Sequence, residues 1–455
     1  MPVAQASPVE ETQSTPWGIE AVNAPALWPV TRGRGTVNVA VFDTGIDATH
    51  PDVGPNVVGG YNVLSKLNEV FDDYGHGTHV AGTIAALDNG FGVVGVAPEA
   101  RLWSVKVLGG DGKGSDETIV AGIDKVLEWK RAIGGQWIVS LSIGSNDSSD
   151  LEKAAFQRLA DEDVLAIAAA GNQGRIELDY PAAYPTVMAI AAIDEDNVLA
   201  NFSNHGLTLA VVAPGVNVVS TYPRGTAVTA AVRVDGQSWI NGFLFIGAPR
   251  REVHGEFVAC GLGKPEDFPA DMKGKIALIV RGEIPFAEKV RNAVDAGAIG
   301  AMVYNYDETD PANWTLYRAD CSDLEKGCVP WSEDVAYPWP VAVALTNADG
   351  LKLLAQKGSA ITIGTWVNDY KTLKGTSMAT PHVSGVAALL WSLNPTAHSA
   401  DVRSVIVNSA RDLGAAGYDD HYGFGLVDAA AAAKLIAPSV PIPPTPQPPR
   451  RRATH

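Results

Sequence analysis

The chain has 455 residues, of which 46% are apolar and 19% are charged, and this balance excludes a disordered chain, a fibre and a small disulfide-stapled protein. Its formal net charge of −17 at pH 7 disfavours nucleic acid and anionic membrane surfaces as partners, because both carry negative charge. The apolar runs, such as residues 187–193, are shorter than the ~18 residues that a membrane span needs.

The composition of both ends of the chain is typical of tails outside a folded domain. Residues 1–11 have neither the basic nor the apolar region of a signal peptide, although Ala4-Gln5-Ala6 has the form of a signal-peptidase site. Either an export signal has been removed or this is an ordinary polar tail. Residues 438–455 are proline-rich with a basic tip, typical of a linker.

Short β-rich runs alternate with helical patterns through the first half of the chain. This alternation predicts an α/β fold with a doubly wound parallel sheet, in which functional groups gather at the carboxyl ends of the strands. The predicted strands are residues 37–42, 102–108, 137–142, 164–170 and 187–193, and the predicted helices are 79–87, 115–130, 150–162 and, later, 381–392.

The character of the sequence changes near Thr226. From there to Thr365 the chain is rich in aromatic residues and carries all three cysteines, and at Lys374 the glycine-rich α/β pattern returns. We therefore expect one domain, residues 12–226 and 366–437, interrupted by a smaller domain at 227–365.

Three segments carry the residues of a nucleophilic site. Asp43 follows a buried strand, His76 opens a helix between glycines, and Ser377 lies at the start of another helix. A serine hydroxyl needs a base within reach, and the base needs a buried carboxylate to orient it. Each residue alone is more often a turn former, a structural histidine or a helix cap. Together, in the order Asp, His, Ser, they match one known order of the catalytic triad.

The blocks DTGID, HGTHVAG and GTSMATPHVSG together resemble the subtilisin-like serine proteases (subtilases, peptidase family S8), over about residues 12–226 and 366–437. The resemblance implies that Asp43 orients His76, that His76 is general base and then general acid, and that Ser377 attacks the scissile carbonyl. His79 and His382 are then structural.

A second resemblance concerns the oxyanion hole. Asn172 ends the apolar run Ala168-Ala-Ala-Gly-Asn172 and matches the family segment whose amide donates to the oxyanion. Without the triad, a turn asparagine after glycine would be the simpler interpretation.

The resemblance also implies where the substrate lies. Two segments match those that hold the substrate backbone as an added β-strand, for which glycine permits close approach. Without the family, each would be a plain glycine-rich loop. Their residues are Gly112, Gly114, Ser142, Ile143 and Gly144.

The P1 pocket would have Ala170 and Gly171 on its rim and Asp179 at its base. A carboxylate at the base would favour lysine or arginine at P1 through charge pairing. The alternative is a solvated loop carboxylate with no role in specificity.

A calcium site is implied by three separated pieces that match family ligands. Ca²⁺ prefers six to eight oxygen atoms of mixed type, which these carboxylate, amide and carbonyl groups can supply. The matching residues are Gln13, Asp52, Leu87, Asn89, Phe91 and Val93.

The insert resembles the protease-associated (PA) domain through a strand in residues 272–282, a helix at 286–298 and a strand at 301–305. That resemblance implies substrate gating or protein binding; a passive insert is the alternative. Cys260, Cys321 and Cys328 allow three single disulfide pairings, and the sequence does not choose among them.

We expect a secreted serine endopeptidase that acts on proteins or peptides as a monomer, binds calcium, and has neither nucleic acid nor a membrane as partner. One alternative is a binding protein built on an inactive catalytic fold, which the intact triad and Asn172 disfavour. Another is peptide ligation through the same acyl-enzyme.

Overall fold

The structure, a computed structural model, describes residues 12–442 apart from 310, 312–313, 318, 321–328 and 331. Two compact units occur: Thr226–Asn368 forms the smaller one, and the chain on either side of it forms the larger one. The insert was expected at residues 227–365, and those domain limits stay a prediction. Cys260 is buried and free, whereas Cys321 and Cys328 lie outside the described residues.

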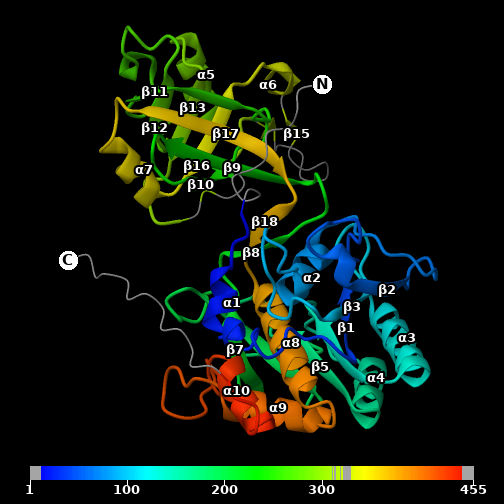
Figure 1. Ribbon diagram of the computed structural model, residues 1–455. Coiled ribbons are helices and arrows are strands. Elements are labelled where there is room, and N and C mark those ends of the chain that lie inside the picture. Colours follow the sequence, from blue (N-terminus) through cyan, green and yellow to red (C-terminus); the bar gives the residue numbers. More distant parts are fainter. Residues whose placement is uncertain are drawn as a thin grey trace. The chain divides into compact units, whose positions relative to one another are not determined.

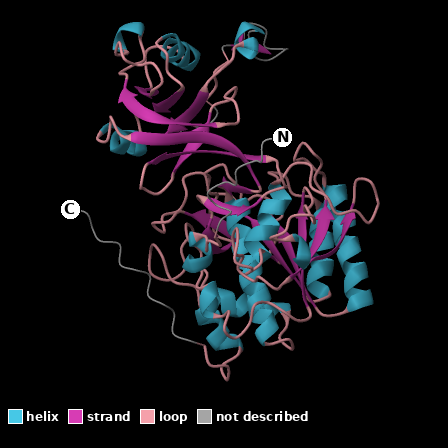
Figure 2. Ribbon diagram, turned by 45° about the horizontal axis from the view of Figure 1, so that its top comes forward, coloured by secondary structure: helices cyan, strands magenta, loops and turns pink. Residues whose placement is uncertain are grey.

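The larger unit contains a seven-stranded sheet whose strands all run parallel (Figures 1 and 2). Helices cover both faces of such a sheet, which explains why several of its strands are buried at every residue. In spatial order the strands are β2 (Val57–Asn62), β3 (Arg101–Lys106), β1 (Val37–Asp43), β4 (Gln136–Leu141), β5 (Val164–Ala169), β6 (Val187–Ile193) and β7 (Leu209–Pro214).

Two consecutive residues of β1 show that the helices lie on opposite faces of the sheet. From β1 the chain passes through β2 and α2 (His76–Ala85) to β3, and then through α3 (Asp116–Ile133) to β4. An added Cβ at Gly77 in α2 would lie 3.0 Å from the Asp43 side chain, and one at Gly122 in α3 would lie 2.7 Å from that of Phe42. Because neighbouring side chains of a strand point to opposite faces, α2 and α3 lie on opposite faces. Helix α4 (Asp150–Asp161) packs against α3, and α8 (Thr376–Leu393) packs against α2. The predicted doubly wound α/β fold is confirmed.

The remaining elements of the larger unit are short and peripheral. They are α1 (Trp17–Ala21), α9 (Ser399–Asn408), α10 (Ala429–Ile436), the antiparallel pair β8 (Val218–Thr221) and β18 (Tyr370–Leu373), and the 3₁₀ turns Ala24–Ala26 and Gly54–Asn56. The structure contains, in its described part, no helix long and apolar enough to cross a bilayer.

Helix α8 begins five residues before the predicted start at Pro381. Proline lacks the N–H that would bond the carbonyl four residues earlier, and it is therefore common in the first turn of a helix. For this reason the sequence predicts a helix start at Pro381. Here it lies inside the helix, and the Ser377 carbonyl that it leaves unbonded accepts a hydrogen bond of 2.7 Å from Ser142 Oγ. The tertiary contact thus compensates for the missing backbone bond.

The smaller unit is a closed barrel, as expected for a β-rich PA-type domain. Around the barrel lie β10 (Ile240–Leu244), β16 (Val341–Leu345), β13 (Gly300–Tyr304), β12 (Ile276–Val280), β11 (Glu252–Ala259), β17 (Ala360–Asn368) and β9 (Ala227–Val234). Helices α5 (Phe286–Asp295), α6 (Ser332–Ala336) and α7 (Asn347–Leu354), the pair β14 (Ala319–Asp320) and β15 (Val329–Pro330), and the 3₁₀ turn Pro265–Asp267 complete it.

Candidate active site

Asp43 and His76 meet at the carboxyl edge of the parallel sheet. Asp43 is the last residue of β1 and is fully buried, and His76 is the first residue of α2. His76 Nδ1 lies 2.8 and 2.9 Å from the two Asp43 carboxylate oxygens. The carboxylate also accepts the Thr44 N–H at 2.7 Å. Asp43 therefore orients the His76 imidazole so that its Nε2 points away from the carboxylate.

A second carboxylate, which the sequence analysis did not select, organises the helix that carries His76. Asp72 accepts hydrogen bonds from the backbone N–H groups of Gly75 and Thr78 and from the hydroxyls of Thr44 and Thr78. Free N–H groups at a helix start favour such a partner. The aspartate four residues before the helix was the available signal.

The electrostatics of the site favour the protonated imidazole. Burial lowers the pKa of His76, but the negative charge and hydrogen bond of Asp43, with a smaller contribution from Asp72, outweigh it and raise the pKa above the ordinary value. By contrast, burial lowers the pKa of His79 to about 3 and that of His382 to about 4, so both are neutral. Such neutral, buried histidines suit the structural role expected of them.

Ser377 is the second residue of α8 and lies beside Ser142, the residue after β4. Its hydroxyl donates to the Ser142 carbonyl at 3.0 Å. Within the described residues, no hydrogen bond joins Ser377 Oγ to His76. Rotation about one side-chain bond redirects this hydroxyl, and such bonds often form only when substrate binds.

Asn172 lies next to the nucleophile with its amide orientation set by Thr376. Asn172 Oδ1 accepts the Thr376 backbone N–H at 2.9 Å and the Thr376 hydroxyl at 3.1 Å. Because both of these bonds use the carbonyl oxygen, the amide NH₂ remains available as a donor. The residue before the serine therefore orients the predicted oxyanion donor, a role that its sequence position alone did not reveal.

A groove of about 700 Å³ runs past His76. The five residues predicted to hold the substrate backbone, Gly112, Gly114, Ser142, Ile143 and Gly144, all line it. At Gly114 an added Cβ would lie 2.7 Å from the Val107 carbonyl oxygen, so only glycine fits without a shift. The structure thus brings the two predicted segments together at one groove.

Asp179 lies beside two of the glycines that were predicted to contact the substrate, and it has a charge partner. Its carboxylate faces Gly171 and Gly144, where added Cβ atoms would lie 2.5 and 3.0 Å from it. It is only 3% exposed and pairs with Arg175 at 2.8 Å, while Asn204 donates to the same oxygen at 3.1 Å. It is therefore not a solvated loop carboxylate, and its negative charge is already offset. Neighbouring Ala170 is buried beside the same segment.

A different acidic pair lines the groove. Glu152, on α4, is 3% exposed, and Asp116, at the start of α3, lines the same groove. Burial, and next the charge of Asp116, raise the pKa of Glu152 to about 7. Neither residue was predicted from the sequence, because acids at the start of a helix are ordinarily stabilising partners of the helix dipole.

The predicted calcium ligands gather at the loop after α2. The Gln13 amide lies 2.6 Å from the Leu87 carbonyl oxygen and 3.3 Å from that of Val93. The fully buried Asp52 carboxylate accepts from the Asn89 amide at 3.0 Å and the Val93 N–H at 3.0 Å.

These donors fit a calcium ion. The Asp52 carboxylate has no lysine or arginine partner among the described residues. Flipping the Gln13 and Asn89 amides would exchange their nitrogen and oxygen atoms and so present two further oxygen ligands. Phe91 belongs to the same loop, where its N–H donates to Asn89 Oδ1 at 3.2 Å.

Comparison with known proteins identifies the family. Residues 33–240 and 343–425 match the subtilase family model, and residues 253–353 match the PA domain model. The chain therefore belongs to the subtilase family and carries a PA domain. It is a subtilisin-type serine endopeptidase, as predicted.

Several relatives extend this match. Subtilisin BL from Lederbergia lenta is 47% identical over 214 residues, which cover 47% of this chain and 77% of the relative. Subtilisin E from Bacillus subtilis (strain 168) is 43% identical over 223 residues, covering 48% of this chain and 56% of the relative.

One solved structure matches along nearly the whole chain. The psychrophilic subtilisin-like protease Apa1 from Pseudoalteromonas sp. AS-11 has a TM-score of 0.67 and 31% sequence identity, with 92% of this chain and 97% of that chain covered. The likeness therefore includes the insert as well as the parallel sheet.

Proposed function

We propose that this endopeptidase cleaves peptide bonds through an acyl-enzyme on Ser377. The observation that carries the proposal is the buried Asp43–His76 pair, at the sheet edge where Ser377 and Asn172 are linked through Thr376. Glycine-rich segments on both sides of the groove support binding of an extended peptide.

The reaction follows from these groups. His76 Nε2 takes the proton of Ser377 Oγ as the oxygen attacks the scissile carbonyl, and Asp43 stabilises the resulting imidazolium. The Asn172 NH₂ and the Ser377 backbone N–H donate to the oxyanion. His76 then protonates the leaving amine, and water hydrolyses the acyl-enzyme by the reverse sequence of proton transfers.

A fluorophosphonate probe together with a generic peptide substrate tests the proposal. We expect covalent labelling at Ser377 and hydrolysis, with both lost in Ser377→Ala, because the probe reacts only with an activated serine. Absence of labelling would support the inactive binding fold. Labelling with mainly ligated product would support the peptide-ligase alternative.

We also propose that Ca²⁺ binds at Gln13, Asp52, Leu87, Asn89 and Val93, with the Phe91 carbonyl as the remaining predicted ligand. The support is the convergence of two carbonyls, two amides and a buried carboxylate at one loop. A bound ion would tie the N-terminal segment to the loop after α2.

Removal of calcium should lower the melting temperature of the full chain. An ion present at about 100 times its Kd stabilises the folded state by ~2.7 kcal/mol, which corresponds to roughly 5–10 °C in Tm. Thermal unfolding of the Ser377→Ala chain, with calcium and with chelator, measures this without self-digestion.

Asp52→Asn should abolish the calcium-dependent part of the shift. The matched control is Asp88→Asn, since Asp88 is in the same loop but pairs with Arg32. A Tm that chelator leaves unchanged would contradict the site.

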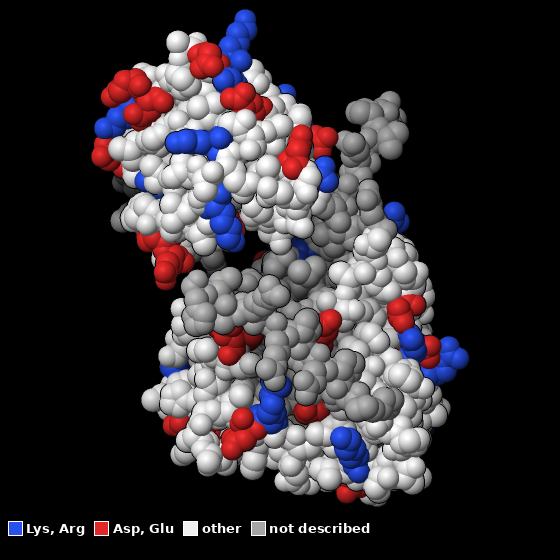
Figure 3. All heavy atoms as spheres, turned by 60° about the vertical axis from the view of Figure 1, so that its left-hand side comes forward, with Lys and Arg blue, Asp and Glu red and all other residues white. Residues whose placement is uncertain are grey.

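A preference for basic substrate side chains is better supported by Glu152 and Asp116 than by Asp179. Asp179 already has Arg175 as its partner, whereas Glu152 and Asp116 both line the groove. The preference for lysine or arginine at P1 stays a prediction that the Arg175 contact weakens. On the face in Figure 3, acidic and basic side chains are interspersed.

A peptide series varied at each position before the scissile bond tests this preference. We expect lysine or arginine to raise kcat/KM about tenfold over leucine at one position, or ~1.4 kcal/mol. The preference should grow as the pH rises through 7, because Glu152 loses its proton there.

Glu152→Gln should remove both the preference and its pH dependence, and Asp179→Asn should leave them unchanged. The opposite pattern would assign the selection to Asp179. Secretion, the monomeric state and a gating role for the PA domain stay predictions.

A further inference from the structure

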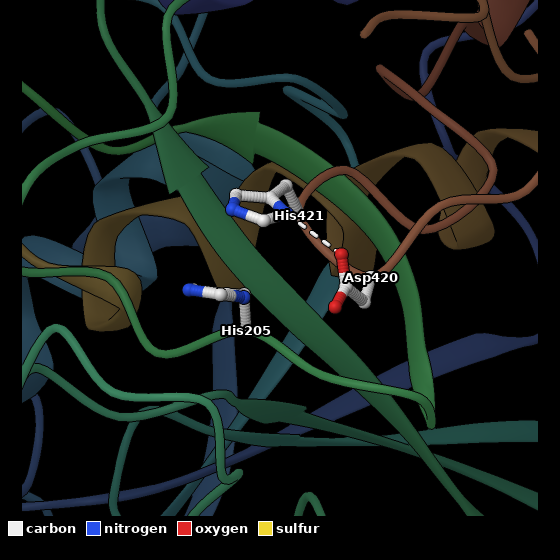
Figure 4. A group of neighbouring side chains, drawn as sticks. All are labelled: His205, Asp420 and His421. Carbon is white, nitrogen blue, oxygen red and sulfur yellow. Dashed lines mark hydrogen bonds and ion pairs between the residues drawn. The ribbon is translucent and has the colours of Figure 1, made fainter. Parts of the chain in front are cut away.

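A cluster of metal-ligating side chains lies outside the substrate groove. His205 is in the loop between β6 and β7, and Asp420 and His421 are in the loop between α9 and α10. One ligand atom from each residue lies within 4.8 Å of the others. Figure 4 shows the two imidazole rings one over the other, with the carboxylate beside them. Their centroids are 4.2 Å apart, and Asp420 Oδ1 is 2.7 Å from His421 Nδ1.

The turn that carries two of these residues is held by a neighbouring carboxylate. Asp419 Oδ1 accepts the backbone N–H groups of His421 and Tyr422, both at 2.8 Å. The backbones of Asp419 and Gly423 also form an antiparallel bridge, with hydrogen bonds of 3.1 and 2.9 Å. Asp419 therefore provides the hydrogen bonds that stabilise the turn, and the side chains of Asp420 and His421 are not needed for it and can face His205.

The two loops are also bonded to each other. The Phe424 N–H donates to the Ala210 carbonyl of β7 at 2.9 Å. The Tyr418 hydroxyl donates at 3.3 Å to the carbonyl of Gly206, the residue after His205. Contacts made by other residues therefore hold the two loops together, independently of any attraction among the three side chains.

His205 supplies an observation that points to a ligand. His205 is only 9% exposed. The Nδ1 atom of its ring has no hydrogen-bond partner in the part of the chain that the structure describes. Buried polar atoms are almost always satisfied, so an unpartnered ring nitrogen facing a carboxylate and a second histidine calls for an explanation. A metal ion bound there would provide one.

We propose that His205, Asp420 and His421 bind a divalent transition-metal ion, with Zn²⁺ as the best match. Two imidazoles and a carboxylate suit Zn²⁺, whereas Ca²⁺ requires a set of oxygen ligands. Bonds of ~2.0–2.1 Å in a tetrahedral site separate ligand atoms by about 3.4 Å. Because the present separations reach up to 4.8 Å, the ligand atoms must approach one another by up to about 1.4 Å.

The exposed residues can make this adjustment. The side chain of His421 is 54% exposed and that of Asp420 is 40% exposed, so both can turn toward the buried His205. Metal binding would replace the Asp420–His421 hydrogen bond and leave a fourth position to water.

Such an ion would join the two loops next to the active site. Asn204, which precedes His205, accepts the Gln173 N–H at 2.9 Å and donates to Asp179 at 3.1 Å. Gln173 follows the predicted oxyanion donor. A metal on His205 would therefore stiffen the loop that supports this segment.

Zinc titration of the full Ser377→Ala chain, in buffer with excess calcium, tests the proposal by calorimetry. We expect one equivalent of Zn²⁺ to bind with micromolar or tighter affinity, and Co²⁺ in its place to give the visible spectrum of a four-coordinate ion. His421→Ala and Asp420→Asn should each weaken binding at least tenfold, because each removes a ligand.

His398→Ala is the matched control, since His398 is also an exposed histidine with a single aspartate partner, Asp163. It should leave the affinity unchanged. His421 is exposed, so its replacement should not unfold the chain, and circular dichroism without metal verifies this. Absence of saturable binding would overturn the proposal, as would equal affinity in the unsubstituted chain and His421→Ala.

Discussion

Replacing Asp43 with asparagine should lower kcat by about 10⁴, the loss that this change causes in another Asp–His–Ser triad. Both carboxylate oxygens of Asp43 face His76 Nδ1 and hold its proton there. An amide can offer its own NH₂ to Nδ1, which favours the tautomer with the proton on Nε2. That tautomer cannot accept the Ser377 proton. Steady-state kinetics with a peptide substrate measures the loss.

The same variant should change the pH profile. Activity needs neutral His76, so it falls as the pH drops through the pKa of His76. Asp43 raises that pKa, and its removal should move the acidic limb of the residual activity to lower pH. Asparagine has the shape of aspartate, and an unchanged Tm verifies the fold. A loss smaller than tenfold, or an unmoved limb, would contradict the role of Asp43.

Replacing Asn172 with alanine should lower kcat by about 10²–10³ with little change in KM, the usual effect of losing one oxyanion donor. Its Oδ1 is occupied by the two Thr376 donors, so the NH₂ is the group that can serve the oxyanion. That bond strengthens in the transition state, which explains why kcat changes and KM does not.

Two further variants make this test specific. Asn172→Asp keeps the shape but lacks the NH₂, and it should lose as much activity as the alanine variant. Thr376→Val removes one of the two bonds that orient the amide but keeps the backbone donor, and its loss should be below tenfold. An unchanged kcat in Asn172→Ala would remove Asn172 from the mechanism.

The sequence predicted the regular parts of the fold well because their signals are local. The strands β5 and β6 are continuous apolar runs and β1 is mostly apolar, and the limits of all three agree with the prediction to within one residue. Edge strand β2 was missed, since Val57–Asn62 contains two glycines and is only partly buried. The start of α8 was placed too late, because the bond from Ser142 that makes Pro381 acceptable comes from a distant segment.

The candidate site divides in the same way. The residues that the motifs mark, Asp43, His76 and Asn172, do lie at the carboxyl edge of the sheet with Ser377. The Arg175 partner of Asp179 and the acidic lining at Glu152 were not predicted, because charge pairing and burial depend on which segments face each other.

Length, composition and charge indicated an acidic globular protein, the alternation of strand and helix patterns predicted the doubly wound fold, and the motifs predicted the chemistry of the site. These follow from short-range patterns: apolar periodicity specifies the elements, and the residue types specify the reaction. Only the tertiary structure decided which carboxylates line the groove, how Thr376 orients Asn172, and that His205 meets Asp420 and His421. Each of these depends on contacts between segments far apart in the chain, whose distances no local pattern encodes.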